Sequence, residues 1–289
     1  MFKKFILSII DKYFLNLSRK REILINLLII FILTCPVIFL AVYSAIADYK
    51  ELTEEVFSRH KSIANLSAAI VKERLDHMVN IGQSLALRSS VITALKIGDM
   101  AGLDESFKMV IKDFSFIDSI FIADINGTML ERTPNSPGNI GKSFAHRDWY
   151  QGASKNWEIY VSEVYKRTAQ PQINVMAIAF PIKNENNKPV GILVLQINLD
   201  IFLRWSKEIE VGPSGFVYFV DRYGQIIAHP KIDIRDNIVN FNDLPAIKEI
   251  LKGNSGIKIF NNQSKENALV AYDNIPPYGF GALVEQPEK

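Results

Sequence analysis

The chain has little of the chemistry that cysteine and histidine supply. Its 289 residues include one cysteine and four histidines, and Cys35 lies inside a long apolar run. A single cysteine excludes a disulfide framework and a cysteine-based zinc site within one chain. The four histidines are scattered without metal-ligand spacing. We therefore expect no metal and no cofactor.

The chain also lacks a surplus of either charge and a recognisable catalytic motif. Its 33 basic residues are nearly balanced by 31 acidic ones, so composition gives no reason to expect a nucleic-acid partner. The sequence contains no Gly-x-Ser-x-Gly elbow, no phosphate-binding loop and no His-Glu-x-x-His, which are motifs with known catalytic mechanics. We expect no enzymatic activity from this chain.

One long apolar segment stands out instead. Residues 23–47 form a run of 25 residues without a charge, and about 20 apolar residues suffice to span a bilayer as a helix. Six basic residues against two acidic ones precede the run, and four acidic residues with one lysine follow it directly. The positive-inside rule then predicts an inner (plasma) membrane protein with residues 1–22 in the cytoplasm and residues 48–289 outside. A cleaved signal peptide is the alternative, because Ala45-Ile-Ala47 resembles a cleavage site, but the long apolar core favours an uncleaved anchor.

A long amphipathic helix is expected to leave the membrane. From Tyr49 to about Leu95 the chain has no proline, and apolar residues recur at three- and four-residue spacing. Residues 48–115 are predicted as this stalk helix and, after a break at residues 98–102, a short connecting helix at residues 103–114. The early apolar positions keep coiled-coil spacing, which predicts a homodimer seam near the membrane. Beyond Ile70 the wider stripe favours packing on the helix's own domain.

An internal repeat organises the rest of the chain. Asp124 and Gly127 align with Asp221 and Gly224, and each Asp-x-x-Gly separates two apolar runs, the pattern of a β-hairpin turn. The fold class predicted is α+β, with two tandem antiparallel-sheet modules at residues 116–210 and 211–287. Strands are expected at 117–123, 128–132, 159–165, 173–182 and 190–199 in the first module, and at 216–221, 225–229, 256–260, 268–273 and 280–285 in the second.

Several motifs in this order carry a family resemblance. They are Arg147-Asp-Trp-Tyr150, the strand sequence of residues 191–199, the segment 220–230 and the closing segment 278–287. Over roughly residues 47–286 the chain resembles the double Cache (dCache) sensor domains of bacterial and archaeal transmembrane receptors. The resemblance implies two PAS-like modules, of which the membrane-distal one (116–210) holds a ligand and the proximal one (211–287) relays the signal.

The resemblance also implies an output domain, which we expect beyond residue 289. The basic N-terminus and the tyrosine-containing exit helix favour a sensor histidine kinase of a two-component system. A chemotaxis receptor and a diguanylate cyclase are alternatives that carry the same type of input domain. A different class of function also remains open: a membrane-anchored interaction or envelope protein that uses both modules for protein contacts and binds no small ligand.

Three neighbouring side chains indicate a ligand pocket. Arg147 offers a planar fork of donors that suits a carboxylate, while Trp149 and Tyr150 offer rigid aromatic walls with a polar atom on each. A loop rich in glycine and proline (residues 133–143) is close enough in sequence to cover such a pocket. The plain alternative is that the two aromatic rings fill the core and Arg147 pairs with Asp148.

In the amino-acid-binding branch of the family, the motif matched by Arg147, Trp149 and Tyr150 grips an α-carboxylate, and Tyr165 falls where a further aromatic pocket residue is expected. This chain departs from that branch at two positions. Gln196 replaces the aspartate that pairs with the α-ammonium, and Arg167 stands where an acid is expected. Because a neutral amide cannot offset a buried ammonium, a small organic acid is the favoured ligand, with an amino acid as the alternative.

Overall fold

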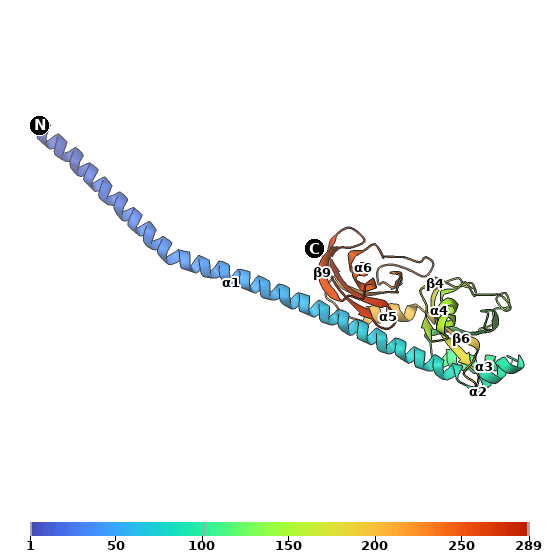
Figure 1. The fold of residues 1–289 in the computed structure, drawn as a ribbon. Helices are drawn as coiled ribbons and strands as arrows, with labels where there is room; N and C mark the ends of the chain where they lie inside the picture. The colour runs from blue at the N-terminus through green and yellow to red at the C-terminus, as the bar shows by residue number, and fades with distance from the viewer. Residues whose placement is uncertain (1, 101, 288–289) are drawn as a thin grey trace. The chain divides into compact units, whose positions relative to one another are not determined.

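The computed structural model describes residues 2–100 and 102–287, and the side chains among them except those of residues 2–23 and Ile29. The chain divides into two units, Met1–Val56 and Phe57–Lys289. The first unit consists of the N-terminal part of α1 (Phe2–Ala86), a helix with Pro36 inside it (Figure 1). From Leu24 onward this is the one helix of the described residues that is long and apolar enough to cross a membrane. The predicted basic character of residues 1–22 lies among the side chains outside the description.

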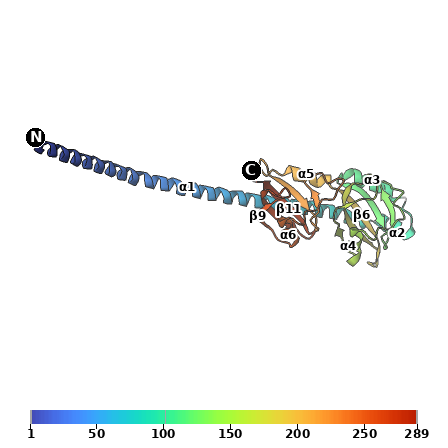
Figure 2. The same cartoon turned by 90° about the horizontal axis from the view of Figure 1, so that it is seen from above.

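The second unit contains two antiparallel sheets, visible side by side in Figures 1 and 2. The first has the strand order β2-β1-β6-β5-β3, with β4 also paired to β5, and the second has the order β8-β7-β11-β10-β9. Counted within each sheet, the two orders are the same, which confirms the predicted α+β fold with a repeated sheet. The strands are β1 (Ile117–Ala123), β2 (Met129–Thr133), β3 (Tyr160–Val161), β4 (Tyr165–Lys166), β5 (Asn174–Lys183), β6 (Pro189–Asn198), β7 (Phe216–Val220), β8 (Ile226–Ala228), β9 (Gly256–Asn261), β10 (Asn267–Ile275) and β11 (Phe280–Pro287).

The helices of the second unit differ from prediction in two places. The long helix ends at Ala86, and the residues predicted to continue it form a separate helix, α2, because the chain turns there to pack on β6. A helix that was not predicted, α4, begins directly after Arg147. The helices that follow α1 are α2 (Ser89–Ile97), α3 (Leu103–Asp113), α4 (Asp148–Asn156), α5 (Asp200–Glu208) and α6 (Pro245–Leu251).

The strand predicted at residues 159–165 is two short strands, β3 and β4. Between them the hydroxyl oxygen of Ser162 accepts the N–H of Ala177 at 2.9 Å. The N–H of Val164 turns away from the sheet and donates to Asp221 of the second sheet's hairpin at 2.9 Å. A side chain thus replaces the backbone in the ladder, and the strand is interrupted.

The repeated hairpin turn is alike in the two sheets down to single hydrogen bonds. Gly127 donates its N–H to the carbonyl of Asp124 at 3.1 Å, and Gly224 donates to Asp221 at 3.0 Å. The φ angles of the two glycines are 82° and 77°, a left-handed conformation that glycine adopts without steric cost. Each aspartate also accepts two backbone N–H groups of its own turn. The internal repeat read from the sequence is therefore confirmed.

One face of α1 packs against both sheets. Its buried residues belong to the same apolar core as one face of each sheet; they are Ala64, Ala68, Val71, Leu75, Met78 and Leu85. Gly82 lies at the closest approach to the first sheet, where a Cβ atom would fall 2.2 Å from the ring of Phe180 and 2.9 Å from Leu195. Glycine at this position lets the helix lie close to β5 and β6.

We predict that Gly82→Ala destabilises the protein, although alanine in place of a helical glycine normally stabilises a helix by about 0.5–1 kcal/mol. The added methyl group overpacks the contact with Phe180, which we expect to lower the free energy of unfolding by about 1–3 kcal/mol in urea denaturation. Gly102→Ala is the matched control, because a Cβ there meets no atom within 4 Å. A Gly82→Ala protein as stable as the wild type would contradict this account of the packing.

His229, at the end of β8, is buried among aromatic rings. Its ring centroid lies 5.1 Å from that of Phe216, 5.0 Å from Tyr218 and 6.2 Å from Phe241. Burial, with a smaller contribution from Lys231, lowers the pKa of His229 from its usual 6.5 to about 4. The folded protein therefore holds this imidazole neutral at pH values where the unfolded chain protonates it.

This difference predicts a pH dependence of stability. Below pH 6.5 the unfolded chain binds a proton at His229 that the folded protein does not, so stability is lost as pH falls from 6.5 towards 4. The loss at pH 4 amounts to about 3 kcal/mol. In chemical denaturation at pH 7 and pH 4, we expect His229→Gln to lose about that much less stability than the wild type. Equal losses in the two proteins would place the pH dependence elsewhere.

Candidate functional site

Strand alternation gives the first sheet two buried faces. Ile120 and Leu195 belong to the core that includes α1, whereas Phe121 and Val194 belong to a second core on the opposite face, together with Trp149 of α4. Because side chains alternate along a strand, residue 196 on β6 faces the same side as Val194.

Gln196 occupies this face with room around it. Its cross-strand neighbours in the sheet are Ser119 on β1 and Ala177 on β5. These small side chains leave space above the middle of the sheet, and α4 and the loop after β2 cover that space.

The covered space contains a small inner cavity of about 20 Å³, room for about one water molecule. Four of the five residues predicted for the ligand site line it: Arg147, Trp149, Tyr165 and Gln196. The fifth, Tyr150, does not line it, since its hydroxyl donates to the carbonyl of Ile125 at 2.7 Å. The remaining lining residues are Phe121, Met129, Arg132, Asn139, Phe144, Thr168 and Ala169.

Gln196 is the centre of a buried hydrogen-bond network. Its Oε1 accepts from the Ser119 hydroxyl at 2.7 Å and from Nη1 of Arg132 at 2.9 Å, while its Nε2 donates to the hydroxyl oxygen of Tyr165 at 2.8 Å. Burial raises the pKa of Tyr165 to about 12, against a lowering by the hydrogen bond from Gln196. The network fixes the amide orientation, because Oε1 faces two donors.

Arg147 precedes the first residue of α4 with extended backbone angles. Its guanidinium carbon lies 5.0 Å from the centre of the Tyr165 ring, and Nη2 donates to the hydroxyl of Thr168 at 3.1 Å. Asp148 does not neutralise it: one carboxylate oxygen accepts from the Tyr160 hydroxyl at 3.0 Å and the other from the N–H of Glu163 at 2.9 Å. The alternative in which Arg147 pairs with Asp148 is therefore not what the structure shows.

Arg132 is a second guanidinium at the cavity, and the sequence analysis did not select it. It lies on β2 directly opposite Phe121 and is buried with 5% exposure. Burial lowers its pKa, while the nearby charge of Asp118 raises it. Its guanidinium donates to the neutral amide of Gln196, and it takes part in none of the ion pairs among the described residues.

Arg167, at the position where an acid was expected, is directed elsewhere. It forms a buried ion pair with Asp118 on β1, and its Nε donates to the carbonyl of Pro171 at 2.7 Å. Asp118 is thereby occupied, and the inner cavity has no acidic side chain among its lining residues.

A larger outer cavity of about 610 Å³ adjoins the inner one. The two share Arg132, Asn139, Thr168 and Ala169 as lining residues, and the loop of residues 134–139 forms one wall of the outer cavity. This loop is the glycine- and proline-containing segment expected to cover a pocket. A ligand larger than water therefore has an approach from the outer cavity that passes Arg132.

The second sheet does not repeat this chemistry. Counting the same 97 residues that separate Asp124 from Asp221, Arg147 corresponds to Leu244 and Trp149 to Ala246. The correspondence holds in the structure, because Arg147 donates its N–H to Phe144 and Leu244 to Phe241, each at 2.9 Å. The arginine and the large aromatic ring are thus particular to the first module.

We predict that Gln196→Leu destabilises the protein by about 3 kcal/mol, because it leaves a buried guanidinium and two hydroxyl groups without their shared partner. Urea denaturation measures the change. Gln196→Glu, which keeps an oxygen for Arg132, is the matched control and should lose less. A Gln196→Leu protein with wild-type stability would show that the network contributes nothing to folding.

Known proteins share this fold. The ligand-binding domain of the Pseudomonas fluorescens chemoreceptor CtaA, solved with L-isoleucine, superposes with a TM-score of 0.65 at 15% identity, covering 83% of this chain and 96% of that domain. The ligand-binding domain of the Pseudomonas aeruginosa chemoreceptor PctB, solved with L-Arg, gives a TM-score of 0.64 at 16% identity, covering 81% and 96%. The fold is therefore that of chemoreceptor ligand-binding domains.

The sequence matches agree with the fold. Residues 44–289 match the Cache domain family, so the chain belongs to that family and is a sensor domain of the double Cache type. The methyl-accepting chemotaxis protein McpA of Bacillus subtilis is 26% identical over 229 residues, which cover 76% of this chain and 32% of McpA. The chain spans a third or less of the length of the curated relatives that it matches.

Proposed function

We propose that residues 48–289 are the extracytoplasmic input domain of a transmembrane receptor, and that the inner cavity of the first module binds the carboxylate of a small ligand. One observation carries this proposal: two guanidinium groups, those of Arg132 and Arg147, line a cavity that has no acidic side chain among its lining residues. This role is recognition, and we assign the chain no catalytic step.

The electrostatics of Arg132 support an anionic ligand. A buried charge is stable only when it is paired or well hydrogen-bonded, and Arg132 has the neutral Gln196 as its side-chain partner at the cavity. A carboxylate entering from the outer cavity meets Arg132 first. Arg147 then offers a planar fork that can hold both carboxylate oxygens.

The same geometry favours an organic acid over an amino acid. An α-ammonium group needs a carboxylate or several acceptors when it leaves water. Asp118 is already paired with Arg167, and the oxygen of Gln196 already accepts two hydrogen bonds. An amino acid is the second candidate, favoured by the L-isoleucine and L-Arg in the similar chemoreceptor domains.

For the rest of the receptor we propose a plasma-membrane anchor at residues 23–47 with a cytoplasmic N-terminus. The exposed apolar side chains along this segment support it. We also propose a homodimer through the part of α1 nearest the membrane, where Leu52 is 61% and Val56 41% exposed. The curated relatives favour a chemotaxis receptor as the whole protein, and the histidine kinase expected from the sequence stays a prediction.

The binding prediction is tested with the 289-residue protein in lipid nanodiscs. Thermal unfolding is followed with a panel of small organic acids, amino acids and amines. A ligand at about a hundred times its dissociation constant adds about 2.7 kcal/mol of stability, which is visible as a rise in melting temperature. We expect an organic acid to stabilise the wild type and Arg147→Ala to abolish that shift, with Arg204→Ala, an exposed arginine on α5, as the control.

The outcomes separate the alternatives. An organic acid that stabilises Arg147→Ala as well as the wild type contradicts the assigned site. Stabilisation by amino acids alone shows that Gln196 accommodates an ammonium after all. A well-folded protein stabilised by none of the panel contradicts the small-carboxylate sensor and favours the interaction or envelope protein.

A further inference from the structure

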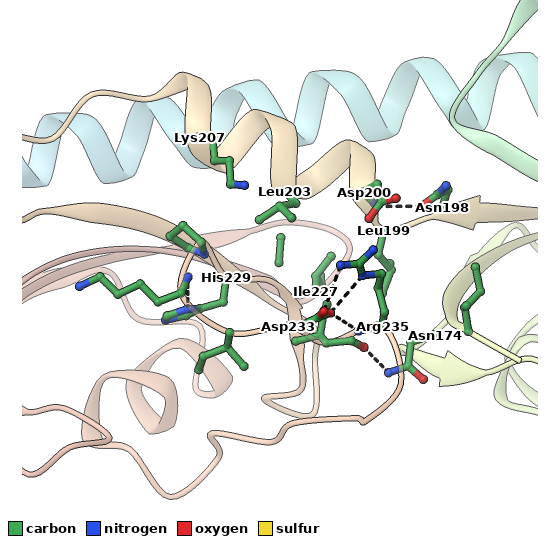
Figure 3. A pocket seen from close by; sticks show the side chains of 16 residues that line it. Asn174, Asn198, Leu199, Asp200, Leu203, Lys207, Ile227, His229, Asp233 and Arg235 are labelled. Atoms are coloured by element: carbon green, nitrogen blue, oxygen red, sulfur yellow. Dashed lines mark hydrogen bonds and ion pairs between the residues drawn. The ribbon is translucent and has the colours of Figure 1, made fainter.

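A second cavity, of about 380 Å³, lies where the two modules meet (Figure 3). This volume is within the range of about 300–1,000 Å³ typical of small-molecule sites. Helix α5 forms one wall, and β8 with the loop that follows it, up to Arg235, forms the other. The ends of β5 and β6 contribute Asn174 and Asn198, so residues of both modules line the same space.

The middle of this cavity is apolar. Leu203 of α5 and Ile227 of β8 line it, and further apolar lining comes from Ile173, Leu199, Ile232 and Ile234. Apolar surface of this kind binds an apolar group by removing it from water. The cavity therefore suits a ligand with a hydrocarbon or aryl body.

The charged groups lie at the edges of the cavity and are unequally distributed. Asp200 and Lys207 are seven residues apart on α5, about 10 Å along the helix axis, and Figure 3 shows Lys207 extending from α5 towards the side that carries His229. Asp233 is paired with Arg235 at 3.1 Å. The cations free to meet an anion are thus at the Lys207 end.

Lys231 adds a second cation beside His229. Its Nζ lies 4.0 Å from the centre of the Phe216 ring, and its backbone N–H donates to Nδ1 of His229 at 3.2 Å. Because a neutral imidazole carries one N–H, acceptance at Nδ1 places the proton on Nε2. With its pKa lowered to about 4 by burial, His229 is a neutral donor at pH 7.

We propose that this cavity is a second ligand site, for an amphipathic monocarboxylate whose apolar chain packs against Leu203 and Ile227. Its carboxylate lies at Lys207, Lys231 and the Nε2 of His229. The site uses none of the residues of the Arg147 cavity, so it stands apart from the function proposed above. A ligand held there touches both modules and joins them.

Hexanoate is the test ligand, because it has a short apolar chain and one carboxylate. Its binding to the 289-residue protein in nanodiscs is measured by ligand-observed NMR titration, with empty nanodiscs as the blank. All proteins carry Arg147→Ala, so the first site is removed. Hexanamide keeps the chain without the charge, and acetate keeps the charge without the chain.

We expect hexanoate to bind more tightly than hexanamide or acetate. Lys207→Gln with Lys231→Gln should weaken hexanoate about tenfold, since two solvent-exposed cations are lost, and added salt should weaken it in the parent protein. Lys188→Gln with Lys258→Gln, which removes two exposed lysines outside the cavity, should change nothing. Both lysines of the first pair are exposed as well, so neither double variant disturbs the core.

Three results would overturn the proposal. Hexanoate fails to bind the Arg147→Ala protein; hexanamide binds as tightly as hexanoate; or the Lys207 and Lys231 variant binds hexanoate as tightly as the parent. Loss of carboxylate binding at the Arg147 site with retained hexanoate binding separates the two sites. Failure of either proposal is therefore visible without the other.

Discussion

The packing of both sheets on one face of α1 is the constraint on which the rest of the second unit depends. Near one end of this stretch, Nε2 of His60 lies 2.7 Å from Oε1 of Gln286 on β11. Near the other, Gly82 lies against Phe180 on β5. The two contacts are 22 residues apart, about 33 Å along a helix. Because interiors are close-packed and repack in discrete steps, neither sheet can slide along the helix without breaking such contacts.

Rearrangement is therefore easiest on the face of the first sheet that α1 does not touch. That face carries the Gln196 network, α4 and the two short strands β3 and β4. The cavity wall at Tyr165 is one residue from Val164, whose N–H donates to Asp221 of the second module. Arg222 of the same hairpin donates to the carbonyl of Val161 at 2.6 Å. A movement of the Tyr165 backbone is thus passed directly to the second sheet's hairpin, without an intervening element.

The repeated turn has acquired a different role in each module. In the first, Asp124 accepts N–H groups of its own turn. In the second, one oxygen of Asp221 does the same, and the other accepts from Val164 and from the Gln225 side chain. Burial raises the pKa of Asp221, and these hydrogen bonds lower it. A residue selected for turn formation also joins the modules.

Local patterns in the sequence were sufficient to predict most of the fold. The Asp-x-x-Gly turns, the alternating strands and the order of elements all depend on neighbours in sequence, and Gln196 was identified from its place on a predicted strand. Helix α4 was missed because its nine residues include Gly152 in the middle, a residue unfavourable in helices. Its presence is explained only by tertiary packing, since a Cβ at Gly152 would fall 2.4 Å from the ring of Tyr160.

Arg132 was missed for a different physical reason. Continuing the pairing of Ala123 with Met129 without interruption would place Arg132 opposite Ile120, on the α1 face. The structure has a β-bulge between Ile122 and Ala123 that places Arg132 opposite Phe121 instead. A shift of one residue moves a side chain to the other face of a sheet. The second guanidinium of the site therefore depends on a backbone irregularity that no residue pattern in this hairpin announces.

The same comparison explains why the second module needs a different place for any ligand. Where the first module has Arg147 and Trp149 at the start of α4, the second has Leu244 and Ala246 at the start of α6. Helix α6 also lies tight on its sheet: a Cβ at Gly281 of β11 would fall 2.6 Å from Ile250. The space that holds the Gln196 network in one module is closed by aliphatic packing in the other. Polar and charged side chains of the second module gather instead at its junction with the first, beside His229 and α5, where the fold leaves a cavity.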